Sequence, residues 1–155
     1  TYVLWFKSSN TLFGSFKSTI MNKMSSTNNK NGFYIGWNSG NRIAINTTGT
    51  YLQKEYLTTN SFNKGQWYML TFVCKISSDL NSTKFYINGS LEVQGEHGTD
   101  TINDTEELLL GNYGAGVGNA TALIGGISEL AVYEGELDSS SVSTIFDNTK
   151  SRFGY

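Results

Sequence analysis

The residues of this chain best suited to chemistry are the closely spaced acids of Glu134-Gly135-Glu136-Leu137-Asp138. Alternate residues of a strand point to one face, so this spacing could pair two carboxylates. A retaining glycoside hydrolase needs two such groups about 5–5.5 Å apart. The segment follows an expected strand at a turn, however, and Asp138 is suited to cap a helix. Glu106 and Glu107 are adjacent and would point to opposite faces. The acids therefore do not predict a hydrolase.

Nucleophilic catalysis finds no better support. His97 is the single histidine and lies in Gly95-Glu96-His97-Gly98, where a loop side chain is more often solvated than a base. No nucleophile motif accompanies it. The glycine-rich segment 111–119 lacks the Lys-Ser/Thr of a phosphate loop. We therefore expect a protein that is not an enzyme.

Composition narrows the class of protein further. The 155 residues are expected to form a single domain, 1–155, which begins inside a strand and is expected to be part of a longer chain.

 The formal charge of −2 comes without a basic stripe, which argues against nucleic acid as a partner. No apolar run approaches the roughly 20 residues that a membrane helix needs, so membrane insertion is not expected. Asn, Ser and Thr are abundant while 15% of residues are charged, which is typical of extracellular, cell-surface or virion-surface β proteins.

Short apolar segments between turn residues predict an all-β protein. Asn38–Asn41 and Asn88-Gly89 are expected to be hairpin turns, since Asn and Gly accept the positive φ that tight turns need. The expected strands are 2–7, 19–23, 33–37, 42–46, 51–57, 67–75, 84–87, 90–93, 108–111 and 127–133. One short helix is expected near the end, capped by Asp138 or Ser139, because Val142, Ile145 and Phe146 recur at helical spacing.

Four motifs occur in an order and spacing that resemble a known family. They are Trp5 in an early aromatic strand, Trp67 at the start of a long strand, the hairpin Tyr86-Ile87-Asn88-Gly89, and the closing strand 126–133. Together they resemble the laminin G-like or concanavalin A-like lectin-glucanase superfamily. The resemblance covers roughly residues 1 to 148. It implies an antiparallel two-sheet jelly-roll sandwich with one short C-terminal helix.

The chain departs from that family in two places. Many relatives carry an acidic residue where Ser128 stands, next to Glu129. The first strand that usually precedes the aromatic segment is not recognised in the sequence, and it is expected either to lie upstream in a longer chain or to be supplied by another chain. An open sheet edge would invite such a strand.

The resemblance also implies that calcium could bind at one rim of the sandwich. Calcium prefers several carboxylate and carbonyl oxygens. Asp100 and Asp104 form the densest acidic loop, with Glu106 close behind, and Asp79 is a candidate from a second loop. Asp100 and Asp104 are therefore the expected metal ligands.

A glycan site needs an exposed aromatic ring beside amides and carboxylates, because a pyranose has an apolar face and a polar rim. Trp5 and Trp67 lie in apolar strands and are expected in the core. Trp37 instead ends a strand beside a polar hairpin, which could place its indole at a rim. The expected ligand-binding residues are Trp37, Asn38, Asn41, Arg42, His97 and Tyr113.

These features favour a non-catalytic carbohydrate-binding or surface-recognition module of an adhesive or receptor-binding protein. Its expected partner is a glycan or a glycosylated surface. The alternative is a structural protein–protein module of a virion or filament, such as a tail-fibre, capsid-decoration or assembly domain, whose partners are neighbouring protein subunits.

Overall fold

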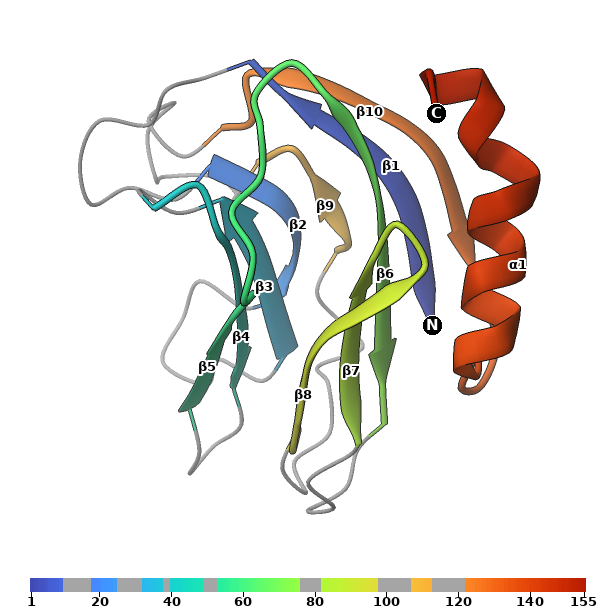
Figure 1. Ribbon diagram of the computed structural model, residues 1–155. Coiled ribbons are helices and arrows are strands. Elements are labelled where there is room, and N and C mark those ends of the chain that lie inside the picture. Colours follow the sequence, from blue (N-terminus) through green and yellow to red (C-terminus); the bar gives the residue numbers. More distant parts are fainter. Residues whose placement is uncertain are drawn as a thin grey trace.

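Two antiparallel five-stranded sheets face each other across an apolar core (Figure 1). A computed structural model describes residues 1–9, 18–24, 32–37, 40–48, 53–75, 82–97, 107–112 and 122–155. The first sheet has the order β10-β1-β6-β7-β8, and the second has the order β5-β4-β3-β2-β9. The strands are β1 (Tyr2–Ser8), β2 (Ser18–Met24), β3 (Gly32–Trp37), β4 (Ile43–Thr48), β5 (Gln53–Leu57), β6 (Trp67–Cys74), β7 (Thr83–Ile87), β8 (Ser90–Gly95), β9 (Leu109–Leu110) and β10 (Gly125–Val132).

The alternation of side chains along β1 shows how the layers form. Leu4 and Phe6 point into the core between the two sheets. Val3 and Trp5 point to the opposite face of the same strand, where a second apolar cluster lies. The first sheet is therefore buried on both faces, and a helix must cover the outer one.

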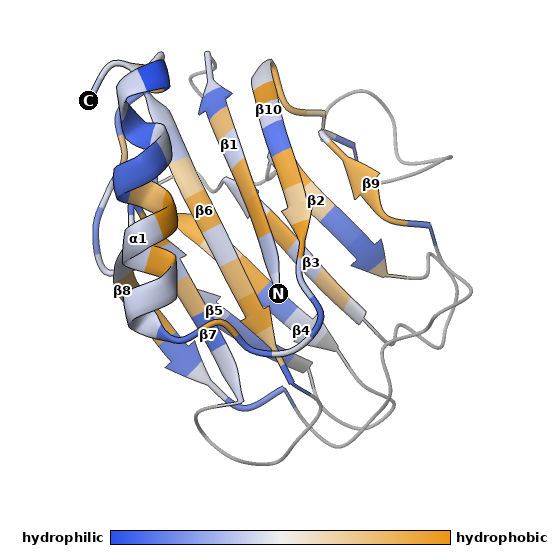
Figure 2. Cartoon of the chain, turned by 90° about the vertical axis from the view of Figure 1, so that its right-hand side faces the viewer, coloured by the Kyte–Doolittle hydropathy of each residue, from blue (hydrophilic) through white to orange (hydrophobic). Residues whose placement is uncertain are grey.

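That helix is α1 (Ser139–Thr149), followed by the short 3-10 helix η2 (Lys150–Phe153). Of the two caps that the sequence predicted, Asp138 is the N-cap, and it accepts a hydrogen bond from the backbone amide of Ser141 at 2.7 Å. Val142 is fully buried against the sheet. Figure 2 shows the apolar side of α1 turned toward the strands.

The turn between β7 and β8 also follows the sequence. Asn88 and Gly89 have φ values of 52° and 80°, the left-handed conformation that tight hairpins use. A Cβ atom on Gly89 would lie 3.2 Å from the Cα of Ser143, so the turn packs directly against α1.

The jelly-roll prediction is confirmed, and the two lateral sides of the sandwich differ. On one side β5 and β8 contact each other across the edges of the two sheets. On the other side β9 has two residues, and the neighbouring β10 leaves Leu130 and Val132 39% and 61% exposed. None of the helices in the described ranges is long and apolar enough to span a membrane.

Candidate functional site

The indole of Trp37 lies inside the core and not at a rim. Its exposed fraction is 0%, and the rings of Phe6 and Phe62 enclose it at centroid distances of 6.1 Å each. The expectation of an exposed platform is therefore wrong. The reason is that Trp37 remains within β3, the central strand of its sheet, and faces the opposite sheet.

The hairpin after Trp37 does reach the surface. Asn41 is exposed with φ 55°, and its backbone carbonyl accepts a hydrogen bond from the amide of Phe62 at 2.7 Å. Arg42 is half-buried, and its Nε donates to the carbonyl of Thr58 at 2.5 Å. The connection after β5 thus holds this hairpin in place. Asn38 lies outside the described residues.

Of the other predicted site residues, the structure describes only His97. His97 is 2% exposed, and its backbone amide donates to Ser82 Oγ at 2.9 Å, so the expectation of a solvated loop side chain is wrong. Tyr113, Asp100 and Asp104 lie outside the described residues. Within the ranges that the structure describes, no three His, Cys, Asp or Glu side chains gather as a metal site would require. Calcium binding stays a prediction.

An exposed polar surface continues from the hairpin onto β8. Asn60 Nδ2 donates to Glu92 Oε1 at 2.8 Å, and the backbone amide of Asn60 lies 3.4 Å from Glu92 Oε2. Thr58 Oγ donates to the carbonyl of Asn60 at 3.1 Å and accepts from the amide of Ile43, which links this pair to the hairpin. We call Asn41, Arg42, Thr59, Asn60, Ser61 and Glu92 the polar rim.

Farther along the same side, Tyr56 closes the seam between β5 and β8. Its ring lies so close to Gly95 that a Cβ atom there would be 2.3 Å away. The Tyr56 hydroxyl donates to the carbonyl of Glu96 at 2.9 Å, and burial raises the pKa of Tyr56, so it stays a neutral hydroxyl. Lys54 pairs with the Glu96 carboxylate at 2.6 Å. The seam therefore fixes the backbone that carries the polar rim.

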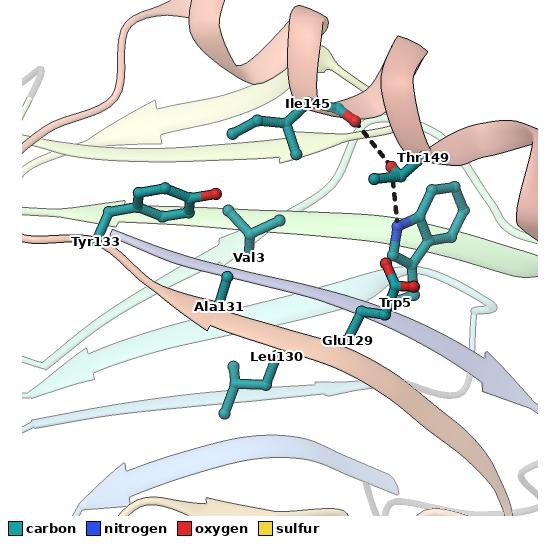
Figure 3. A pocket seen from close by; sticks show the side chains of 8 residues that line it. All are labelled: Val3, Trp5, Glu129, Leu130, Ala131, Tyr133, Ile145 and Thr149. Carbon is teal, nitrogen blue, oxygen red and sulfur yellow. Dashed lines mark hydrogen bonds between the residues drawn. The ribbon is translucent and has the colours of Figure 1, made fainter.

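A pocket of about 180 Å³ lies elsewhere, between β1, β10 and α1 (Figure 3). Thr149 Oγ accepts a hydrogen bond from Trp5 Nε1 at 3.3 Å and donates to the carbonyl of Ile145 at 2.8 Å. Glu129, at φ 54° beside a β-bulge, accepts a hydrogen bond from Arg152 at 2.5 Å. Because these polar groups already have partners in the protein, the pocket offers mainly apolar surface.

The acids that could have suggested hydrolysis serve other contacts. Asp138 caps α1, and Glu136 pairs with Lys75 at 3.3 Å. Neither forms part of the polar rim.

Sequence reasoning missed Asn60 and Glu92. They are 32 residues apart, and neither belongs to a motif. No local signal could have paired them, since they meet through the contact between the edges of two different sheets.

A family model described as the concanavalin A-like lectin/glucanases superfamily matches residues 1–143. No curated protein sequence matches the chain. The fold is similar to that of an SAP-like pentraxin from Limulus polyphemus, with a TM-score of 0.69 and 19% identity over 94% of this chain and 68% of that one.

Two other similar structures hold saccharides. CBM40 of the IT-sialidase from Ruminococcus gnavus, bound to α2,3 sialyllactose, has a TM-score of 0.71 and 12% identity over 94% of this chain and 80% of its own. Domain 4 of AbnA, an extracellular arabinanase from Geobacillus stearothermophilus, is in complex with arabinotriose. It has a TM-score of 0.63 and 23% identity over 93% of this chain and 64% of its own. At these identities the likeness establishes the fold.

Proposed function

The chain belongs to the concanavalin A-like lectin/glucanases superfamily, and from this premise we propose that it is a non-catalytic module that binds a glycan or a glycosylated surface through the polar rim. The observation that carries the proposal is the Glu92 carboxylate, which Asn60 holds in place at the surface and which Thr58 links to the hairpin that carries Arg42. The saccharide complexes of two similar structures support the class of ligand.

The groups of the polar rim suit sugar hydroxyls. A hydroxyl both donates and accepts, so it can donate to Glu92 while accepting from Arg42 or an amide. Hydrogen bonds to charged groups are the stronger ones. The Asn60 contact also reduces the freedom that Glu92 would lose on binding. The rim therefore combines donors and acceptors in a preorganised arrangement.

A glycan array with the purified protein tests this proposal, read first with calcium and then with a chelator. Asn60→Ala and Glu92→Gln are each expected to weaken binding about tenfold, which corresponds to the loss of one hydrogen bond to a charged group. Asn148→Ala and Glu134→Gln, at exposed positions away from the rim, are the matched controls. Saturable binding that neither rim variant weakens would refute the site, and no binding by the folded protein would refute the function.

The chelator measurement tests the proposed calcium site. Loss of binding on chelation, and loss in Asp100→Asn or Asp104→Asn, is the expected result if these residues bind calcium beside the glycan. Unchanged binding would remove calcium from the proposal. An extracellular, cell-surface or virion-surface location is proposed with the same function.

A second candidate function is a structural protein–protein module of a virion or filament. The open side of the sandwich favours it, because Leu130 and Val132 are exposed there and β10 pairs only with β1 among the described strands. Sedimentation equilibrium of the purified protein distinguishes the two functions. A monomer that binds glycans supports the first, whereas an assembly that binds none supports the second.

A further inference from the structure

The hydroxyl of Tyr155 is held by three polar groups from other parts of the chain. Gln66 Nε2 and Asn88 Nδ2 donate to it at 3.2 and 3.0 Å, and it donates to the backbone carbonyl of Trp67 at 2.5 Å. A hydroxyl has one hydrogen to donate and two lone pairs, so these groups satisfy it completely. We call Gln66, Trp67 and Asn88 the hydroxyl cradle.

Both amides of the hydroxyl cradle are oriented by further contacts. Gln66 Oε1 accepts from the Tyr68 hydroxyl at 3.1 Å, and Asn88 Oδ1 accepts from the backbone amide of Met69 at 2.9 Å. Because each amide oxygen has its own donor, each amide nitrogen is directed to the position of the Tyr155 hydroxyl. An ammonium group cannot accept these bonds, and a carboxylate cannot donate to Trp67. The hydroxyl cradle is therefore suited to a neutral hydroxyl.

The occupant comes from the last segment of the sequence, Lys150–Tyr155, which we call the strap. Phe153 stacks on Trp5 with ring centroids 4.1 Å apart and an angle of 14°. The Tyr155 ring lies 5.6 Å from that of Phe146 and is 43% exposed as a residue. The strap lies beyond the residues that the family model matches, 1–143, whereas the hydroxyl cradle lies within them.

We propose that the hydroxyl cradle is a second saccharide-binding site, for a sugar ring that presents a hydroxyl group, and that Tyr155 occupies it in competition with the sugar. A pyranose hydroxyl has the same hydrogen-bonding capacity as the Tyr155 hydroxyl. Its C–H face can take the place of the Tyr155 ring against Phe146. This site is separate from the polar rim and does not depend on it.

Because the strap closes the site in most molecules, the apparent affinity for a competing ligand equals the intrinsic affinity multiplied by the fraction of molecules in which the site is open. A strap held by the equivalent of one to two net hydrogen bonds leaves roughly one molecule in 10 to 100 open. Tyr155→Ala is therefore expected to raise saccharide affinity about 10- to 100-fold. Tyr155→Phe keeps the ring but removes the hydroxyl, and a smaller increase is expected.

Titration of isotope-labelled protein with methyl α-glucoside, methyl α-galactoside and methyl α-mannoside, followed by NMR, tests the proposal. The side-chain amide signals of Gln66 and Asn88 report on the hydroxyl cradle directly. At least one glycoside should shift both signals in Tyr155→Ala at concentrations that leave the wild-type signals unchanged. Adding Gln66→Ala to Tyr155→Ala should abolish this increase in glycoside affinity. The control variant Tyr133→Ala, which alters another exposed tyrosine, should show no increase.

Glycoside binding no tighter in folded Tyr155→Ala and Tyr155→Phe than in the wild type would overturn the proposal. A tyrosine of a partner protein could also place a ring hydroxyl in the hydroxyl cradle, and N-acetyltyrosinamide is the probe for this alternative. Its binding without glycoside binding would also overturn the saccharide assignment. Asn60→Ala and Glu92→Gln can be added to Tyr155→Ala to separate the two sites. If the increase in glycoside affinity persists in that variant, the hydroxyl cradle binds saccharide independently of the polar rim, even where the polar rim binds none.

Discussion

Replacement of Trp37 by alanine is expected to lower the free energy of unfolding by about 3–5 kcal/mol. The indole is fully buried between Phe6 and Phe62. Alanine would leave a cavity in the centre of the core, because the surrounding strands are held by their hydrogen-bonded register and can collapse little. For a domain of this length, 1 kcal/mol corresponds to about 2–4 °C, so Tm should fall by roughly 6–20 °C.

Trp37→Phe separates the role of the ring from that of the indole nitrogen. Trp37 Nε1 is buried and has no hydrogen-bond partner among the described residues. Phenylalanine removes this unsatisfied donor, which offsets part of the loss in packing. The expected cost is below about 2 kcal/mol.

Urea unfolding monitored by circular dichroism measures both variants, and the glycan array at a temperature where they are folded measures recognition. Stability should fall in the order wild type, Trp37→Phe, Trp37→Ala, while glycan affinity remains that of the wild type. If Trp37→Ala kept its stability and lost glycan binding, the indole would be an exposed platform and its placement in the core would be refuted.

Three further changes test the fold and its chemistry. Asp138→Ala should lower Tm by a few degrees at pH 7, because it removes the helix cap. The hydrogen bond from the Ser141 amide lowers the pKa of Asp138 in the folded protein. The difference in Tm between the wild type and Asp138→Ala should therefore vanish as the pH falls below the folded-state pKa and the wild-type cap is protonated. Gly89→Ala should lower the free energy of unfolding by about 1–2 kcal/mol, because the φ of Gly89 is 80° and the added Cβ atom would meet α1. An unchanged midpoint of urea unfolding would contradict this turn conformation. Burial raises the pKa of the Cys74 thiol to about 12. Because the thiolate is the reactive form, iodoacetamide at pH 8 should modify the folded protein at least about a hundredfold more slowly than the urea-unfolded protein. Equal rates would contradict the burial of Cys74.

Local patterns in the sequence determined the strands, the turns and the helix. Short apolar segments placed β1 and β6, Asn88-Gly89 marked a hairpin through its tolerance of positive φ, and Asp138 or Ser139 marked the start of α1. These features depend on neighbours within a few residues, which is why they can be read from one sequence. The order of the motifs resembled that of a known family, and the jelly roll was predicted through this resemblance.

Only the tertiary structure decided which faces are buried and which side chains meet. Trp37 looked like a surface residue because polar residues follow it, yet its strand lies at the centre of a sheet and its ring faces the core. Asn60 meets Glu92, and Tyr155 meets Gln66 and Asn88, across separations of 32, 89 and 67 residues. Such contacts depend on how the sheet edges and the strap are packed together, and no local pattern in the sequence encodes that packing.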